Sequence, residues 1–165
     1  MAEEAAPSIA FIDTDYQEFL KPGDMPIKVQ KFCRETGQKV PETKGEIVRI
    51  ILESLALKYK EEFTNIEQMA GNRIETMHIV GGGTQNLLLN QFTANALNRK
   101  VITGPVEATA IGNILGQLMA LGVLSSTDEA REVVRNSFDT QVYTPSNISG
   151  LEASYERYQS IRKLE

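Results

Sequence analysis

The sequence has no tryptophan, one cysteine, Cys33, and one histidine, His78. A single cysteine cannot form a disulfide within the chain, and it cannot build a zinc site made of several thiolates. A single histidine removes most histidine chemistry as well, including metal sites that use several imidazole ligands. These absences exclude a disulfide-stapled secreted domain and a zinc-finger-like module.

Long apolar runs and an excess of positive charge are also missing. No apolar stretch approaches the roughly 20 residues that a membrane-spanning helix needs, and the N-terminus, MAEEAAPS, lacks the basic start and apolar core of a secretory signal. Lys and Arg number 17 against 22 Asp and Glu, which gives a formal net charge of -5. That balance provides no basic surface for nucleic acid or an anionic membrane. We expect a soluble, cytoplasmic chain of 165 residues, about the size of one domain.

Helix signals dominate the first part of the chain, after an irregular lead-in over residues 1–24. Asp24 is a candidate N-cap for a helix that ends near Thr36. Thr43 and Glu46 match the capping box, in which a hydroxyl and a carboxylate satisfy each other's backbone donors, and the helix that follows should end near Gly71. Its predicted buried stripe consists of Val48, Ile51, Leu52, Leu55, Tyr59, Phe63, Ile66 and Met69. The charged run at 58–62 is expected to be a solvated face of this helix.

The hydrophobic period then changes. Residues 74–80 are typical of a strand, three glycines follow, and a helix from Thr84 to about Leu97 leads to a second strand at 100–103. Such a strand–helix–strand order predicts a parallel unit. Two strands are too few for an independent parallel sheet, so the sheet is expected to be incomplete in this chain. The predicted fold class is α/β.

Three further elements are expected toward the C-terminus. A helix should run from about Glu107 to Leu121, and a second capping-box pattern at Ser126 should open a short helix. A loop then leads to a terminal amphipathic helix that carries Leu151, Tyr155, Tyr158 and Ile161 on one face.

The segment with the clearest chemical content is Gly81-Gly82-Gly83 and the Thr84-Gln85-Asn86 that follows it. Glycines between a strand and a helix let a ligand lie against the backbone without meeting a Cβ, and the helix start offers free N–H groups. A tight turn without any ligand explains the glycines equally well. The segment lacks the Lys and Ser/Thr of a P-loop and the third glycine of a dinucleotide fingerprint.

No catalytic constellation is visible among the other candidates. His78, inside an apolar strand, is expected to be a core histidine, and Cys33 is expected to serve packing. Asp13, Asp15 and Asp24 are general bases in principle, but nothing in the sequence pairs or positions them.

The stretch from His78 to Asn113, HIVGGGTQNLLLNQFTANALNRKVITGPVEATAIGN, resembles the C-terminal region of the FGGY carbohydrate kinases. The segments FLKPGDMP at 19–26, FCRETGQKVPE at 32–42 and ESLALKYK at 53–60 are similar to the rhamnulokinase branch of that family. Together these stretches cover most of the chain, from about residue 11 to residue 143.

The resemblance implies the C-terminal part of an actin-like, ribonuclease-H-like ATPase domain, with parallel strand–helix units and additional helices. It implies that residues 1–165 form the C-terminal segment of the second, nucleotide-binding domain of a sugar kinase. By this resemblance Gly82 and Asn86 contact the adenosine part of ATP, and Gly81 and Gly83 shape the loop. Glu107 is expected to be structural and not catalytic, because a carboxylate at a helix start is favoured by the helix dipole. ATP with Mg²⁺ is the implied cofactor, and L-rhamnulose or a related ketose is the implied substrate.

The phosphate-binding loops, sugar-binding residues and catalytic aspartate of the family have no counterpart in this sequence. The resemblance therefore implies that the segment alone is inactive, with no catalytic residue and no metal ligand of its own. Two alternatives stay open: a kinase for a related ketose such as L-fuculose, and a nucleotide-binding or interaction module without catalysis.

Overall fold

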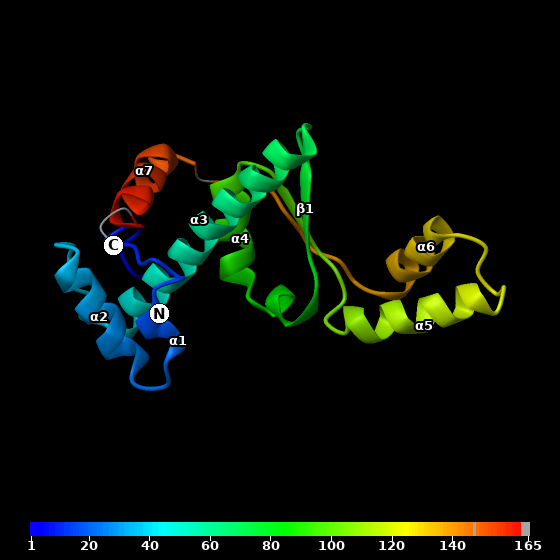
Figure 1. Ribbon diagram of the computed structural model, residues 1–165, viewed down its shortest axis with the longest axis horizontal. Helices are drawn as coiled ribbons and strands as arrows, with labels where there is room; N and C mark the ends of the chain where they lie inside the picture. The colour runs from blue at the N-terminus through cyan, green and yellow to red at the C-terminus, as the bar shows by residue number, and fades with distance from the viewer. Residues whose placement is uncertain (147, 163–165) are drawn as a thin grey trace.

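The computed structural model describes residues 1–146 and 148–162 as seven α-helices, one 3-10 helix and three short strands (Figure 1). The α-helices are α1 Gln17–Leu20, α2 Met25–Glu35, α3 Lys44–Ala70, α4 Leu87–Leu97, α5 Ala108–Ala120, α6 Thr127–Ser137 and α7 Leu151–Arg162. The strands are β1 Thr76–Ile79, β2 Lys100–Thr103 and β3 Val142–Tyr143, and the 3-10 helix spans Gly81–Gln85. In Figure 1, α1, α2 and α7 gather beside α3 at one end, whereas α5 and α6 form an arm at the other.

The sheet confirms the predicted parallel unit. β1 and β2 pair in parallel, from Thr76 opposite Lys100 to Ile79 opposite Thr103, and α4 connects them. β3 pairs antiparallel to β2 in a segment for which the sequence predicts a loop. Its two residues are too few to show a strand period, and it is held by backbone pairing with a strand far away in the sequence. Within the described ranges β1 has a partner on one side only, as expected of an incomplete sheet.

α3 begins at the predicted capping box. Thr43 Oγ1 accepts a hydrogen bond from the Glu46 amide at 3.2 Å, and Glu46 Oε2 accepts one from the Thr43 amide at 2.9 Å. The backbone donors of Thr43 and Glu42 hold the pKa of the Glu46 carboxyl below its usual value. The local signal therefore fixes this helix start, as the sequence indicated.

The predicted buried stripe of α3 is only partly right. Val48, Ile66 and Met69 are exposed, although Leu52 and Phe63 are buried as expected. α3 packs against α4 on one side and against the N-terminal segment on another. Its buried residues therefore lie on two faces and not along one continuous stripe. The buried residues of α3 are Gly45, Ile47, Ile50, Leu52, Ser54, Ala56, Leu57 and Phe63.

The lead-in over residues 1–24 is irregular, apart from the short α1, which the sequence did not indicate. Phe11 and Ile12 are nevertheless buried. The Gln38 side chain bonds both main-chain groups of Phe11, each at 2.8 Å, and the Ile12 amide donates to Ser54 Oγ at 2.9 Å. Side chains thus satisfy a buried extended backbone that has no neighbouring strand.

α7 forms as predicted and packs onto this N-terminal segment and α3. Tyr158 and Ile161 are buried in the main core cluster, and Leu151 and Tyr155 pack against it. Burial is the main cause that raises the pKa of Tyr158 to about 12.

The expectation of a solvated face at 58–62 is wrong for most of this run. The Lys58 side chain is only 17% exposed, and its amine lies 2.7 Å from Asp15 and 2.8 Å from Glu62. Partial burial acts to lower the pKa of Lys58, but hydrogen bonds with the two carboxylates outweigh it and raise that pKa. Arg162 of α7 adds ion pairs to Asp13, Asp15 and Glu61. Glu62 is a local partner of Lys58, but Asp15 and Arg162 come from the N-terminal segment and α7, far from 58–62 in the sequence.

The α5–α6 arm and one face of the sheet are open. α5 buries none of its residues, and Ile114 and Leu121 are exposed. His78 is exposed too, so the prediction of a core histidine is wrong. Side chains alternate along a strand, and α4 packs with Met77 and Val101, which places His78 on the uncovered face. No helix in the described ranges is long and apolar enough to cross a bilayer.

Candidate functional site

The glycine turn follows β1 directly and forms the 3-10 helix, and α4 begins only at Leu87. The prediction of a helix from Thr84 is therefore three residues early. Thr84 Oγ1 donates to the carbonyl of Gly81 at 2.8 Å, and the Asn86 amide donates to the carbonyl of Gly83 at 3.2 Å. The second of these is a backbone bond that spans three residues, so the backbone turns more tightly here than in an α-helix.

The three glycines have different surroundings. Gly81 has a φ of +79°, a conformation that favours glycine, and its amide donates to the Pro105 carbonyl at 3.0 Å. Gly82 is exposed, and a Cβ at this position would meet no atom within 4 Å. Gly83 is also exposed, and its Cβ would lie 3.6 Å from the Ile79 side chain. Gly81 thus shapes the turn, and Gly82 leaves bare backbone open to a ligand.

Asn86 is the N-cap of α4. Its Oδ1 accepts a hydrogen bond from the Leu89 amide at 3.1 Å, which satisfies one of the free donors at the helix start. The side chain is exposed, and its Nδ2 makes no hydrogen bond to the described residues. The same side chain therefore has one structural atom and one donor that remains available to a ligand.

Asn90 supports the glycine turn by a hydrogen bond to its backbone, a role that the sequence analysis did not predict. It is fully buried, and its Nδ2 donates to the Thr84 carbonyl at 3.0 Å, while its Oδ1 has no partner among the described residues. The available signal was a polar residue inside the apolar run of α4, at a position that faces the core. With the Thr84 hydroxyl on Gly81, this contact fixes the shape of the turn from two sides.

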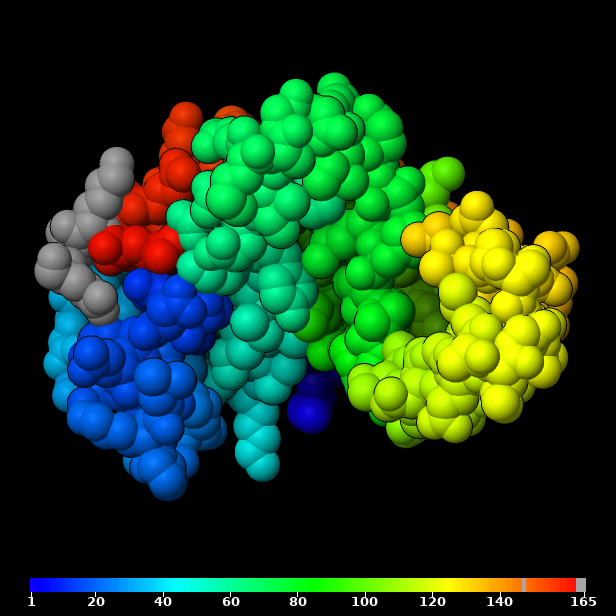
Figure 2. Space-filling model, turned by 45° about the vertical axis from the view of Figure 1, so that its right-hand side comes forward, coloured from blue at the N-terminus to red at the C-terminus, as the bar shows by residue number. Residues whose placement is uncertain are grey.

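A second turn lies beside the glycine turn. The Gly104 amide, just after β2, donates to the Ile79 carbonyl at 2.8 Å, and a Cβ on Gly104 would lie 2.9 Å from Val80 Cγ1. A cavity of about 450 Å³ opens between the two turns and the segment after α6. Figure 2 shows the arm of α5 and α6 beside the body that carries the glycine turn. The lining residues are Thr84, Gln85, Leu87, Thr103, Gly104, Pro105, Val106, Glu107, Ile111, Phe138, Asp139 and Gln141.

The turn and the cavity beside it suit a flat, uncharged group better than an anion. The open backbone at Gly82 leaves room for a flat group, and Asn86 has a free donor, but neither residue lines the cavity, which begins at Thr84 and Gln85. The cavity lining contains two carboxylates, Glu107 and Asp139, and no Lys, Arg or His. Such a lining repels phosphate oxygens and accepts hydrogen bonds from amines and hydroxyls.

The other candidates from the sequence have structural roles. Asp13 and Asp15 belong to the ion cluster around Arg162, and Asp24 Oδ1 caps α2 by accepting from the Ile27 amide. Cys33 is buried as predicted, and burial raises the pKa of its thiol to about 11, which keeps it protonated and unreactive at neutral pH.

Glu107 is the N-cap residue of α5, at the helix start where the sequence placed it, and its exposed carboxylate makes no capping hydrogen bond. In the described part of the chain, no three His, Cys, Asp or Glu side chains come together as a metal site would require.

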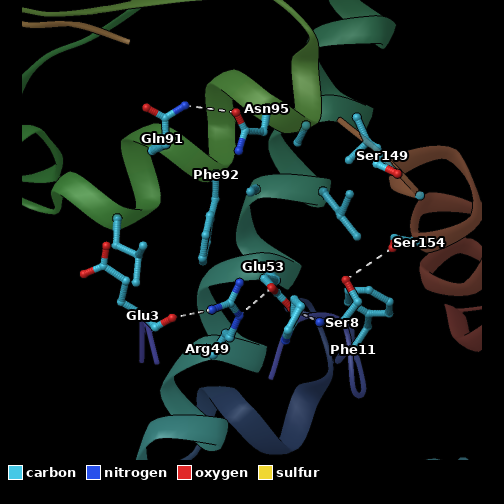
Figure 3. Close-up of a pocket in the computed structure, with 17 residues that line it drawn as sticks. Glu3, Ser8, Phe11, Arg49, Glu53, Gln91, Phe92, Asn95, Ser149 and Ser154 are labelled. Atoms are coloured by element: carbon cyan, nitrogen blue, oxygen red, sulfur yellow. Dashed lines mark hydrogen bonds and ion pairs between the residues drawn. The ribbon is translucent and has the colours of Figure 1, made fainter. Parts of the chain in front are cut away.

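A larger cavity of about 530 Å³ lies between α3, α4, α7 and the N-terminal segment (Figure 3). Arg49 is the basic side chain in its lining, and its Nε pairs with Glu53 at 2.8 Å. Arg49 Nη1 donates to the carbonyls of Ala2, Glu3 and Ala5. Glu53 in turn accepts from the Ser8 amide at 2.8 Å. These charged groups satisfy one another and hold the N-terminal segment in place.

Residues 1–121 match the FGGY family of carbohydrate kinases, C-terminal domain. The chain belongs to this kinase family. α6, β3 and α7 follow the matched region.

Curated relatives agree over nearly the whole chain. A rhamnulokinase of Bacteroides thetaiotaomicron is 40% identical over 159 residues, covering 96% of this chain and 33% of the relative. A rhamnulokinase of Enterococcus faecalis is 42% identical over 165 residues, covering 99% and 33%. The chain therefore spans about a third of the length of the curated FGGY relatives that it matches.

Solved structures confirm the fold class. A xylulose kinase from Rhodospirillum rubrum superposes with a TM-score of 0.58 at 19% identity, covering 78% of this chain and 25% of that one. A xyloylose kinase from Brucella ovis gives 0.59 at 21% identity, covering 77% and 27%. At this identity the likeness concerns the fold alone, and it agrees with part of an actin-like kinase domain.

The brace beneath the glycine turn can be tested without any ligand. We predict that Asn90→Leu, which keeps the side-chain volume and removes the donor to Thr84, speeds amide exchange at Gly82 and Gly83. The loss of one hydrogen bond, about 1 kcal/mol, corresponds to roughly fivefold faster exchange. Hydrogen–deuterium exchange with mass spectrometry measures it.

Thr93→Val is the matched control for this experiment. It removes another fully buried hydrogen bond of α4, from Thr93 Oγ1 to the Leu89 carbonyl, without touching the turn. Equal exchange at Gly82 and Gly83 in both variants would show that Asn90 does not hold the turn.

Proposed function

We propose that this chain is the C-terminal segment of an ATP-dependent kinase that converts L-rhamnulose to L-rhamnulose 1-phosphate, and that it binds the adenosine part of ATP. The names of relatives at 40–43% identity support the sugar. The observation that carries the nucleotide role is the exposed backbone of Gly82, with no atom within 4 Å of the Cβ position. It lies next to a cavity whose charged lining residues, Glu107 and Asp139, are both acidic. Residues 1–165 then belong to the second, nucleotide-binding domain.

The geometry of the turn suits adenosine. A purine is flat, so it approaches the main chain at Gly82 without meeting a side chain. Asn86 Nδ2 donates to a ring nitrogen or a ribose hydroxyl, while Asn86 Oδ1 stays on the Leu89 amide. Gly81 and Gly83 hold the turn in shape. Since the cap fixes the Asn86 side chain before the ligand arrives, little conformational entropy is lost on binding.

In the proposed reaction this segment positions ATP and supplies no group that takes part in the chemical step. Phosphoryl transfer to the primary hydroxyl needs a carboxylate base and donors that hold the phosphates in line, with Mg²⁺ neutralising charge. Among the described residues, the carboxylates near the turn are those of Glu107 and Asp139 in the cavity wall, and no hydrogen bond positions either of them as a base. We assign the base, the sugar contacts and the phosphate and Mg²⁺ contacts to the remaining two thirds of a kinase of the relatives' length. Fixing adenosine here orients the γ-phosphoryl group toward them.

Two alternatives make different predictions. A kinase for a related ketose such as L-fuculose differs in its sugar contacts, which we assign to the part of a full-length kinase outside this chain. A nucleotide-binding module without catalysis is favoured by one observation, the absence of a positioned base in the described residues. A cytoplasmic location is part of the proposal, because ATP and the sugar are both found there.

We predict that the 165-residue chain alone transfers no phosphate from ATP to L-rhamnulose, whereas a full-length kinase that carries it does. A coupled ADP-release assay with L-rhamnulose and L-fuculose measures both activities. Turnover by the short chain above a no-enzyme control would contradict this division of roles. A full-length protein that turns over L-fuculose faster would favour the related kinase.

The adenosine assignment predicts the effect of Gly82→Val in the full-length kinase. The added side chain blocks the approach of the ring, so the KM for ATP should rise by about tenfold or more, equivalent to about 1.4 kcal/mol. The KM for the sugar and the melting temperature should stay near wild type, since a Cβ at Gly82 meets no neighbour.

Gly116→Val on α5 is the matched control, because a Cβ there also meets nothing within 4 Å.

Asn86→Ser keeps an N-cap oxygen and removes Nδ2, so it should raise the KM for ATP roughly three- to tenfold without lowering the melting temperature. Normal ATP affinity in both site variants would show that adenosine does not bind at this turn.

A further inference from the structure

The cavity beside the glycine turn has a third wall that comes from beyond the family match. Phe138, Asp139 and Gln141 line it, and they follow α6, whereas the match ends at residue 121. The other two walls lie in the matched domain: Thr84, Gln85 and Leu87, which follow the three glycines, and the turn from Gly104 to Glu107. The segment after α6 therefore completes a cavity that the matched region alone leaves open.

This third wall is fixed in place by backbone contacts. The Thr103 amide donates to the Gln141 carbonyl at 2.9 Å, and the Gln141 amide donates to Thr103 Oγ1 at 3.0 Å. Thr103 is itself a lining residue at the end of β2, and β3 continues the pairing from Val142. The segment is thus tied to the same strand that carries one of the two turns.

Phe138 is the aromatic residue of the lining, and its side chain is 40% exposed. An exposed phenyl ring costs free energy in water, and that cost is recovered when a flat ring stacks on it. Leu87, Val106 and Ile111 add apolar surface to the cavity. Because Glu107 and Asp139 are the charged residues of the lining, the occupant is the uncharged nucleoside end of a nucleotide and not its phosphates.

We propose that Phe138 is a nucleobase-stacking residue, and that the segment after α6 closes the adenosine site opened by the glycine turn. The proposal rests on the proposed function, because it places the adenosine already assigned to Gly82 in this cavity. Asp139 and Glu107 accept hydrogen bonds from the exocyclic amine or the ribose hydroxyls. Phe138 touches the ligand and takes no part in the transfer of the phosphoryl group.

The test is isothermal titration calorimetry of the full-length kinase with adenosine, a probe without phosphates. Phe138→Ala should weaken adenosine binding roughly 5- to 100-fold, the range for loss of one stacked base. Phe138→Tyr, which keeps the ring, should restore affinity to near wild type. Val133→Ala is the control, because Val133 is a similarly exposed apolar residue of α6 that does not line the cavity.

Kinetics and thermal melts separate stacking from a merely structural role. Phe138→Ala should raise the KM for ATP and leave kcat and the KM for the sugar unchanged, with a melting temperature close to wild type. If Phe138→Ala binds adenosine as wild type does while Gly82→Val does not, the stacking role is wrong and the turn remains the site. If both variants bind as wild type, the adenosine site itself lies elsewhere.

Discussion

Parallel pairing of β1 with β2 is the constraint on which the candidate site depends. Parallel strands end at the same edge of a sheet, so the turns that follow them emerge side by side. Two backbone hydrogen bonds extend this pairing past the strands, from Gly104 to Ile79 at 2.8 Å and from Gly81 to Pro105 at 3.0 Å. The glycine turn and the β2–α5 turn are therefore held side by side, and the cavity lies between them.

The helices act on this edge in two ways. α4 supports the glycine turn through the Asn86 cap and the Asn90 brace, and its packing on α3 makes that support rigid. The α5–α6 arm instead leaves apolar surface open, as does the sheet face that carries His78. Exposed apolar faces of this kind are typical of surfaces that contact other protein segments.

The sequence predicted features whose causes are local. The capping box at Thr43, the parallel unit and the position of the glycine turn were correct, because each follows from neighbouring residues or a short period. Features set by distant partners were not predicted: the partial burial of Lys58 beside Asp15, the exposure of His78 and the brief strand β3. The candidate site shows the same division, since the resemblance indicated Asn86 but neither its cap nor the wall contributed by Phe138.

A crystal structure of the full-length kinase with bound ADP tests the central claim most directly. The account predicts adenosine against the bare backbone of Gly82, with Asn86 Nδ2 within hydrogen-bond distance and the purine inside the cavity beside the turn. The phosphates should point out of that cavity, away from Glu107 and Asp139. Adenosine bound elsewhere, with this cavity empty and Gly82 in contact with solvent, would contradict it.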